Sequence, residues 1–331
     1  MANYRKISGV NVKSYSADPD RTYPSGMEGK LYYNSSDGQF KFVGLGAGTW
    51  ASGNNLNTAR DGLGGTGIQT AALGIGGFVP PNTAKNIVES YDGSSWTEIA
   101  DINTARRLMA SAGTTTSAII FGGGPPQVAI AESWNGSSWT EVADLNLARS
   151  HLMGAGASNT SALAYGGTDG SSYPAPDYHT GKTESWNGTA WTEVADLGTG
   201  RYGAGADGTA TAAIAAGGTA AGAKDETETW NGTAWTELAD INTGRSYLEA
   251  AGTTTSALAF GGNPATGKTE SWDGSSWTEL ADMATARLHS GGAGTNNTSA
   301  LVFGGTAPPD SGLNATEEWT FGHAFKKVTT G

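Results

Sequence analysis

One phrase recurs along the chain and restricts the folds open to it. The phrase Glu-Ser-Trp-Asn-Gly-Ser-Ser-Trp-Thr-Glu-Val-Ala-Asp occupies residues 132–144. An arginine recurs along the chain together with the phrase, and successive arginines lie 42 to 52 residues apart. Self-similarity at such a period is the signature of a repeat architecture. Further copies of the phrase begin at Glu89, Glu184, Glu228 and Glu270, and a degraded copy begins near Glu317.

Each repeat unit is expected to form four short strands. After the arginine come a segment of small residues, an apolar run such as Ser256–Phe260, and a glycine pair such as Gly261-Gly262. The phrase follows, with two aromatic residues around an Asn-Gly or Asp-Gly dipeptide, which is a strong signal for a tight hairpin turn. A unit of this length holds four strands of about five residues, the size of one β-propeller blade. The repeats therefore predict an all-β fold of six four-stranded blades.

The last blade needs a fourth strand from elsewhere in the chain. Six arginines and six glycine pairs are present, but five complete fourth strands follow them. A further copy, Gly48–Trp50, precedes the first arginine, and we expect this N-terminal strand to complete the sixth blade and close the ring. Phe325–Val328 could serve instead, and the sequence does not decide between the two.

The recurring residues resemble a known motif. A double glycine, an aromatic residue before Asp-Gly or Asn-Gly, a tryptophan five residues later and then an arginine resemble the kelch motif over about residues 48–320. The resemblance implies a six-bladed kelch-like β-propeller of four-stranded blades, which we place at residues 48–331. Residues 1–47 form a separate N-terminal segment.

The composition excludes several classes of function. The formal net charge is −12, and no basic cluster is present, so we expect no nucleic-acid partner. There are no cysteines, and the four histidines lack metal-ligand spacing, so we expect no metal and no cofactor. The N-terminus lacks the apolar core of a signal peptide, and no apolar stretch is long enough to cross a bilayer. We therefore expect neither membrane insertion nor export by the usual signal.

The residues that recur once per blade are expected to be structural. A side chain needed for packing recurs in every blade, whereas a binding site rarely needs six copies. The tryptophans should pack between blades, although a carbohydrate-stacking platform is the alternative. The arginines should pair with aspartates five residues earlier, such as Asp144 before Arg149; an anion-binding ring is the alternative. These structural residues are Arg60, Arg106, Arg149, Arg201, Arg245 and Arg287, with Trp139, Trp191, Trp235 and Trp277.

Binding is expected at the loops between the second and third strands, because their lengths vary while the rest of the repeat is constant. The longest of these loops, Thr168–Lys182, contains aromatic and polar residues suited to a glycan or a peptide. Its candidate ligand-binding residues are Tyr173, Asp177, Tyr178 and His179. We expect no enzyme, because the sequence has no nucleophile-elbow motif and most exposed carboxylates serve solvation. A ring of carboxylates with raised pKa values in the central channel would favour catalysis again.

The N-terminal segment carries the second resemblance. Leu31–Tyr33 and Gln39–Phe42 read as two strands joined through Asp37-Gly38, a β-hairpin. The phrase Glu-Gly-Lys-Leu-Tyr-Tyr-Asn-Ser-Ser-Asp-Gly-Gln-Phe-Lys at residues 28–41 resembles hairpins of tail-fibre and other virion proteins of bacteriophages, especially marine ones.

This resemblance implies a virion structural protein, made in the host cytoplasm, whose N-terminal segment binds other virion proteins. A tail fibre or receptor-binding protein that contacts host-surface glycans or proteins is the first expectation, and a capsid decoration protein is the second. Phage fibres are commonly trimers, so the resemblance also implies a homotrimer. The alternative from another class is a cellular kelch scaffold for protein partners.

Overall fold

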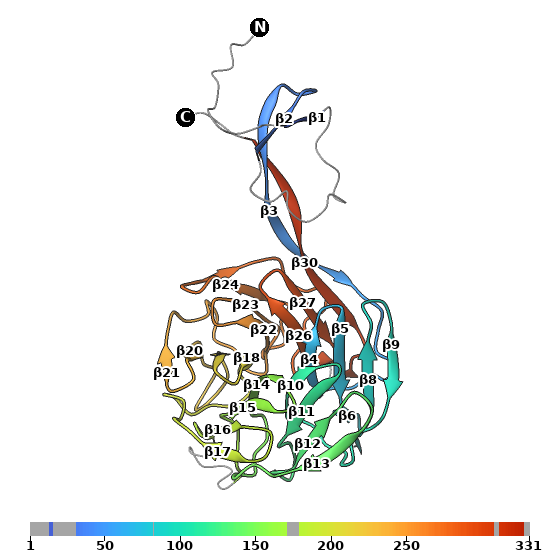
Figure 1. Cartoon of the computed structure of the whole chain (residues 1–331), viewed down its shortest axis with the longest axis vertical. Helices are drawn as coiled ribbons and strands as arrows, with labels where there is room; N and C mark the ends of the chain where they lie inside the picture. Colours follow the sequence, from blue (N-terminus) through green and yellow to red (C-terminus); the bar gives the residue numbers. More distant parts are fainter. Residues whose placement is uncertain (1–12, 16–30, 82, 171–178, 308–310, 328–331) are drawn as a thin grey trace. The chain divides into compact units, whose positions relative to one another are not determined.

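The computed structural model describes residues 13–15, 31–81, 83–170, 179–307 and 311–327. The chain divides into two compact units (Figure 1). The smaller comprises Met1–Thr49 with Phe321–Gly331, and the larger comprises Trp50–Thr320. The sequence predicts a division after residue 47, with the C-terminal residues in the larger unit; in the structure, residues from Phe321 onward group with the N-terminal segment. No helix of the described residues is long and apolar enough to cross a membrane.

The larger unit contains five antiparallel sheets of four strands, each sheet in chain order. Within each repeat, the glycine pair lies between the second and third strands and the Asn-Gly or Asp-Gly turn between the third and fourth. The sheets are β4 (Gly64–Ile68), β5 (Ala71–Ile75), β8 (Val88–Tyr91) and β9 (Trp96–Ile99); β10 (Ala110–Thr114), β11 (Ser117–Phe121), β12 (Ala131–Trp134) and β13 (Trp139–Val142); β14 (Met153–Ser158), β15 (Ser161–Tyr165), β16 (Thr183–Trp186) and β17 (Trp191–Glu193); β18 (Gly205–Thr209), β19 (Ala212–Ala216), β20 (Thr227–Trp230) and β21 (Trp235–Glu237); and β22 (Glu249–Thr253), β23 (Ser256–Phe260), β24 (Thr269–Trp272) and β25 (Trp277–Glu279). Two short pairs lie in the loops: β6 (Phe78–Val79) with β7 (Thr83–Ala84), and β28 (Thr306–Ala307) with β29 (Ser311–Gly312).

A further sheet joins the two ends of the repeat region. Its order runs β26 (Gly291–Asn296), β27 (Ser299–Phe303), β30 (Thr316–Lys327) and then β3 (Gln39–Ser52). The indole of Trp50, at the end of β3, stacks on Trp319 of β30 with ring centroids 5.4 Å apart. The N-terminal strand thus takes the fourth place in this sheet. Residues 325–327 continue β30 itself, the third strand, which settles the choice that the sequence left open.

The first strands of the six sheets contact one another in cyclic order. β4 contacts β10, and the series continues through β14, β18, β22 and β26, which contacts β4 again. The close approach depends on small residues: a Cβ added to Gly65 of β4 would lie 2.5 Å from the backbone nitrogen of Gly292 in β26. This cyclic series of antiparallel sheets, visible around the centre of the larger unit in Figure 1, is compatible with a β-propeller.

Tryptophans connect each sheet to the one before it. In every sheet the aromatic residues of the third and fourth strands stack, with centroids 4.9 to 5.6 Å apart. The fourth-strand indole also donates a hydrogen bond to the preceding sheet or to the segment that follows it. Trp277 donates to Thr227 Oγ1 at 3.0 Å, and Trp50 donates to Thr269 Oγ1 at 2.9 Å. The tryptophans therefore pack between sheets and form no exposed stacking platform.

The recurring arginines are buried in ion pairs, but their partners are not the aspartates predicted from the sequence. Each binds the glutamate at the second position of the third strand of its own sheet. The distance is 2.6 to 2.9 Å in the five pairs Arg60–Glu89, Arg106–Glu132, Arg149–Glu184, Arg201–Glu228 and Arg287–Glu317, and Arg245 pairs with Glu270 in the same way. The aspartates, such as Asp144, lie exposed in the connections. The prediction was wrong because a carboxylate close in sequence can point to solvent, whereas the glutamate lies on the buried face of a strand.

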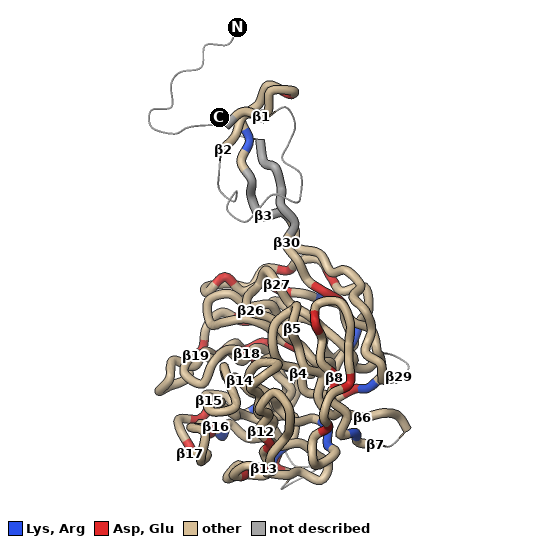
Figure 2. The backbone as a smooth tube through the Cα atoms, turned by 45° about the vertical axis from the view of Figure 1, so that its right-hand side comes forward, with Lys and Arg blue, Asp and Glu red and all other residues tan. Residues whose placement is uncertain are grey.

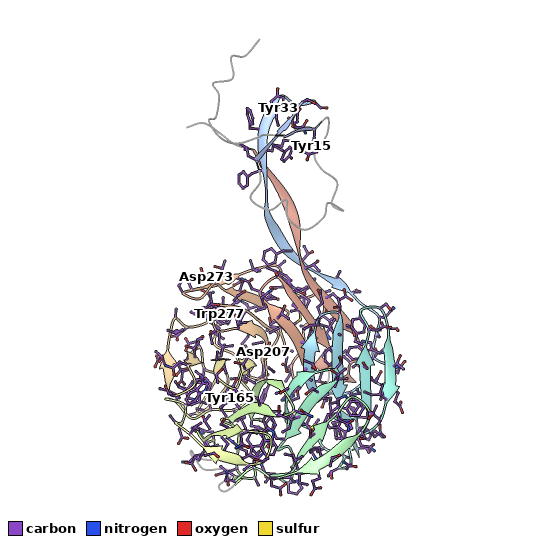
Figure 3. The ribbon with its side chains drawn as sticks, viewed as in Figure 1. Tyr15, Tyr33, Tyr165, Asp207, Asp273 and Trp277 are labelled. Atoms are coloured by element: carbon purple, nitrogen blue, oxygen red, sulfur yellow. The ribbon has the colours of Figure 1, made fainter. Side chains whose placement is uncertain are left out.

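The smaller unit contains the expected hairpin. β2 (Leu31–Asn34) pairs antiparallel with the start of β3, and β1 (Lys13–Tyr15) pairs parallel with β2. In the turn, Asn34 Oδ1 accepts hydrogen bonds from two backbone N–H groups, and Gly38 adopts φ of 71°. Tyr33 packs against Phe40 with ring centroids 5.1 Å apart, and Tyr15 and Tyr33 are labelled in Figure 3.

Candidate functional site

Six equivalent residues surround one end of the inner strands, and we call this set the collar. Each lies two positions after a recurring arginine, and each has φ between 50° and 60°. This left-handed conformation suits glycine and is uncommon for other residues. The collar residues are Gly62, Leu108, His151, Gly203, Tyr247 and His289.

Backbone hydrogen bonds run continuously around the collar. The N–H of each collar residue donates to the carbonyl of the collar residue before it, at 2.6 to 3.2 Å, as from Leu108 to Gly62 and from His151 to Leu108. The N–H of Gly62 donates to the carbonyl of His289 at 2.8 Å and completes the circle. These bonds help to hold the unusual backbone conformation, and they occupy the amide group of each collar residue.

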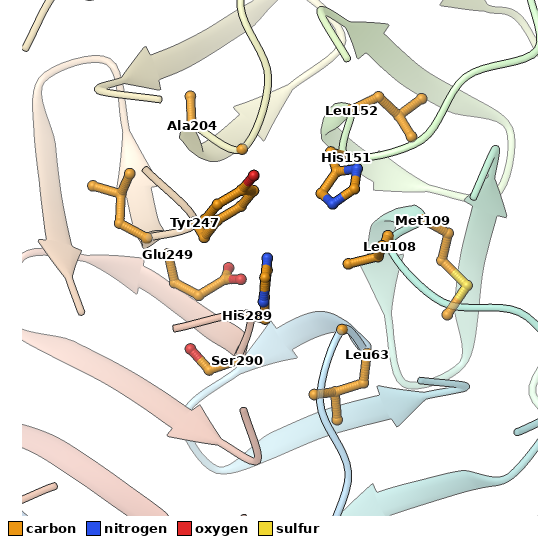
Figure 4. A pocket seen from close by; sticks show the side chains of 13 residues that line it. Leu63, Leu108, Met109, His151, Leu152, Ala204, Tyr247, Glu249, His289 and Ser290 are labelled. Carbon is orange, nitrogen blue, oxygen red and sulfur yellow. The ribbon is translucent and has the colours of Figure 1, made fainter. Parts of the chain in front are cut away.

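Three collar side chains converge over a hollow of about 80 Å³ (Figure 4). The rings of Tyr247 and His289 have centroids 4.2 Å apart, and His151 lies 5.6 Å from Tyr247 and 6.0 Å from His289. Leu108 lines the hollow from another side, and the Glu249 side chain lies beside His289. We call this space the collar hollow. Burial lowers the pKa of His151 to about 4 and that of His289 to about 3, so both imidazoles are neutral near pH 7.

A narrow channel continues from the collar hollow between the inner strands. Its two lined sections hold about 90 and 50 Å³, and Glu249 borders both of them as well as the hollow. Most of the remaining lining is small residues, and the hydroxyls of Thr66 and Ser111 donate to the carbonyls of Gly113 and Gly65. Such a channel has room for a few water molecules, each of which takes about 30 Å³ in the liquid.

Two carboxyl groups lie in this channel. Asp207, labelled in Figure 3, accepts hydrogen bonds from the N–H groups of Gly208 and of Gly252 in the neighbouring sheet. Burial raises the pKa of Asp207 to about 7. Burial, together with the charge of Asp207, raises the pKa of Glu249 to about 8. Each carboxyl keeps some contact with solvent along the channel, and the pair retains at least one proton near neutral pH.

A second hollow, of about 280 Å³, lies among loops that follow the second strands of two neighbouring sheets. It is bordered by Phe78, Arg107 and Pro125-Pro126, and the guanidinium of Arg107 lies 4.1 Å from the centroid of the Phe78 ring. Figure 2 marks Lys and Arg residues beside β6 and β7, in this region. The loop that holds Phe78 pairs with the connection before β4 through Asp61, next to the collar, so this hollow and the collar share one side of the larger unit.

Most of the residues that the sequence predicts to bind ligand lie outside the residues that the structure describes. Tyr173, Asp177 and Tyr178 lie outside the described residues. His179 is described; it forms a β-bridge with Thr168 and lines none of the hollows given above. Among the residues that line the collar hollow and channel there is no arginine, so the six recurring arginines do not form an anion-binding ring there.

Sequence reasoning missed the collar, although a signal was present. Two residues after each arginine the repeat stops being regular, and the position holds Gly, Leu, His, Gly, Tyr and His in turn.

Within the described part of the chain, no group of three or more His, Asp or Glu side chains could hold a metal ion.

Comparison with known proteins shows the fold alone. No family model matches the sequence, and no curated protein matches it. Among solved structures, the chain is similar to that of YjhT, with a TM-score of 0.68 and 15% identical residues. The match covers 83% of this chain and 99% of YjhT. At so low an identity, the similarity extends to the arrangement of the strands and not to the activity.

Proposed function

We propose that the larger unit is a six-bladed kelch-like β-propeller closed by the N-terminal strand, and that the chain is a non-enzymatic binding protein of a bacteriophage particle. Within the particle, a tail fibre or receptor-binding role fits best, with the propeller presenting the collar side to host-surface glycans. The cyclic contacts of the inner strands and the circle of collar hydrogen bonds support the count of six blades.

The main observation in favour of a binding role is that the buried ion pairs are the same in every repeat, whereas the collar side chains differ from one repeat to the next. The buried arginine–glutamate pairs recur in all six repeats. The collar residues occupy equally equivalent positions, yet His151, Tyr247 and His289 bring side chains that the other positions lack. Packing of a symmetric ring requires no such difference, whereas a site for an asymmetric ligand does.

The dimensions of the channel favour binding over catalysis. Asp207 and Glu249 have the raised pKa values that would suit an acid–base pair. However, the channel sections beside them hold only about 50 and 90 Å³, too little for a sugar ring to pass between the two carboxyl groups. Their protonated state instead avoids placing two negative charges in a narrow channel.

The virion assignment rests on the N-terminal hairpin, whose phrase resembles hairpins of phage virion proteins. It is tested by raising an antibody against residues 48–331 and locating gold label on purified particles by electron microscopy. Label at tails or fibre tips is the expected result. Label over the capsid would indicate a decoration protein, and absence of label from all particles would overturn the virion assignment and favour a cellular kelch scaffold.

A further inference from the structure

The collar hollow combines three kinds of group that favour a hydroxyl-rich ligand. The Tyr247 and His289 rings offer apolar faces at its edge. The buried Nε2 atom of His289 makes no hydrogen bond with any described residue. The Glu249 carboxyl group also borders the hollow. A buried polar atom without a partner is costly, so a ligand that supplies the partner gains affinity.

The lining also indicates the charge of the ligand. No lysine or arginine lines the collar hollow in the described part of the chain, and the charge of Arg107, which adds to the effect of burial in lowering the pKa values of His151 and His289, acts from outside the lining. An anionic group in the hollow would therefore lack a direct ion-pair partner. Both imidazoles are neutral near pH 7, and a protonated Glu249 can donate as well as accept a hydrogen bond. These groups suit uncharged hydroxyls, which also both donate and accept.

The collar offers little to a peptide. Extended peptides commonly bind by adding a strand to a free sheet edge. Here the backbone N–H group of each collar residue is already used in the circle of hydrogen bonds. Recognition at the collar must therefore come from side chains, and a hollow of about 80 Å³ admits one edge of a small ring rather than a chain.

We propose that the collar hollow binds the terminal, uncharged sugar residue of a glycan. The edge of the sugar that enters the hollow would pack its C–H groups against Tyr247, and its hydroxyls would hydrogen-bond to His289 Nε2 and the Glu249 carboxyl group. This inference rests on the proposed function in one respect, namely that the glycan belongs to the host surface.

The collar itself provides the variants for a test. Two of its positions, Gly62 and Gly203, already hold glycine in the same backbone conformation, so Tyr247→Gly removes the aromatic ring without straining the backbone. Glu249→Ala removes the carboxyl group, whereas a glutamine would still donate and accept hydrogen bonds. Glu141→Ala is the matched control, since it removes an exposed carboxyl group of β13 that lines none of the hollows.

The measurement is titration of the full chain with methyl glycosides of glucose, galactose, mannose and N-acetylglucosamine, followed by saturation-transfer NMR. We expect at least one glycoside to bind, and Tyr247→Gly and Glu249→Ala each to weaken its affinity about tenfold, the equivalent of ~1.4 kcal/mol. Glu141→Ala should weaken the affinity less than about threefold, or ~0.7 kcal/mol. If Tyr247→Gly fails to fold, as judged by its thermal transition, Glu249→Ala carries the test.

Two results would overturn the inference: binding of none of the four glycosides, or binding that both substitutions leave unchanged. Binding of an extended peptide that Tyr247→Gly abolishes, without sugar binding, would also overturn it. The gold-labelling experiment separates this inference from the proposed function. Label on fibres without sugar binding would refute only the collar site, whereas sugar binding without label on particles would refute only the phage assignment.

Discussion

The buried ion pair between Arg106 and Glu132 gives the most quantitative prediction. The Arg106 Nη1 atom lies 2.8 Å from Glu132 Oε1, and the side chains are 3% and 0% exposed. The other carboxylate oxygen of Glu132 accepts hydrogen bonds from the backbone N–H and the side-chain amide of Asn103, at 2.7 and 2.8 Å. Glu132 therefore holds both the arginine and the connection between two sheets.

The expected cost of Glu132→Gln follows from this geometry. Removing one partner of a buried ion pair leaves the other charge without compensation, which costs about 3 to 5 kcal/mol. The glutamine keeps the shape and one acceptor, so we expect a loss near the lower limit, about 3 kcal/mol. Replacing both partners, as in Arg106→Met with Glu132→Leu, should cost less than the single substitution, because no charge then remains buried.

The assay is urea unfolding followed by tryptophan fluorescence, with the midpoint and slope compared between variants. Glu141→Gln is the matched control: it removes a carboxylate from the neighbouring strand β13, where the side chain is exposed, and should change the unfolding free energy by about 0.5 kcal/mol or less. A loss below about 1 kcal/mol for Glu132→Gln, or a double variant less stable than the single one, would refute the reasoning.

Three further predictions concern the closing strand, the channel and the inner strands. Trp50→Ala should lower the unfolding free energy by about 3 kcal/mol, matching Trp277→Ala at the equivalent place; a much smaller loss at Trp50 would argue against closure by β3. Because the pKa values of Asp207 and Glu249 are raised to about 7 and about 8, the folded state holds protons that the unfolded state releases above about pH 4, so stability should fall as the pH rises from about 4 to 8. The free energy of unfolding of Glu249→Gln, taken relative to that of the parent chain, should therefore be on the order of 2 kcal/mol higher at pH 9 than at pH 5. Unfolding at both pH values measures this, and an equal difference at the two would contradict the raised pKa of Glu249. Gly65→Val should prevent soluble folding or lower the melting temperature sharply, because its side chain would meet the backbone of β26; an unchanged melting temperature would refute the close approach.

The parts of the fold that recur were predictable from the sequence. The hairpin turns after Trp134 and its counterparts, the glycine pairs and the spacing of the arginines indicated four-stranded units, and the described sheets have this form. The partner of each arginine was misjudged, because short sequence distance favoured the aspartate. The recurrence of a glutamate two residues before the third-strand aromatic, on the same face of the strand, was the better indicator.

The collar could not be predicted by the same reasoning. Repeat analysis depends on the positions that are constant, and the collar is defined by positions that differ between repeats. Its members, such as His151 and Tyr247, are separated by whole repeats in sequence and become neighbours through the cyclic contacts of the inner strands. The pair of channel carboxyl groups could not be predicted for a similar reason. In the sequence, Asp207 and Glu249 look like isolated surface residues, and only the placement of their strands side by side brings them into one channel.

The central claim is that the collar side of this chain binds the host surface for a phage. The most direct measurement is whether the purified full chain blocks adsorption of the proposed phage to host cells, compared with the Tyr247→Gly and Glu141→Ala chains. The account predicts that the parent chain and Glu141→Ala block adsorption and that Tyr247→Gly does not. Failure of the parent chain to block, or equal blocking by all three chains, would contradict it.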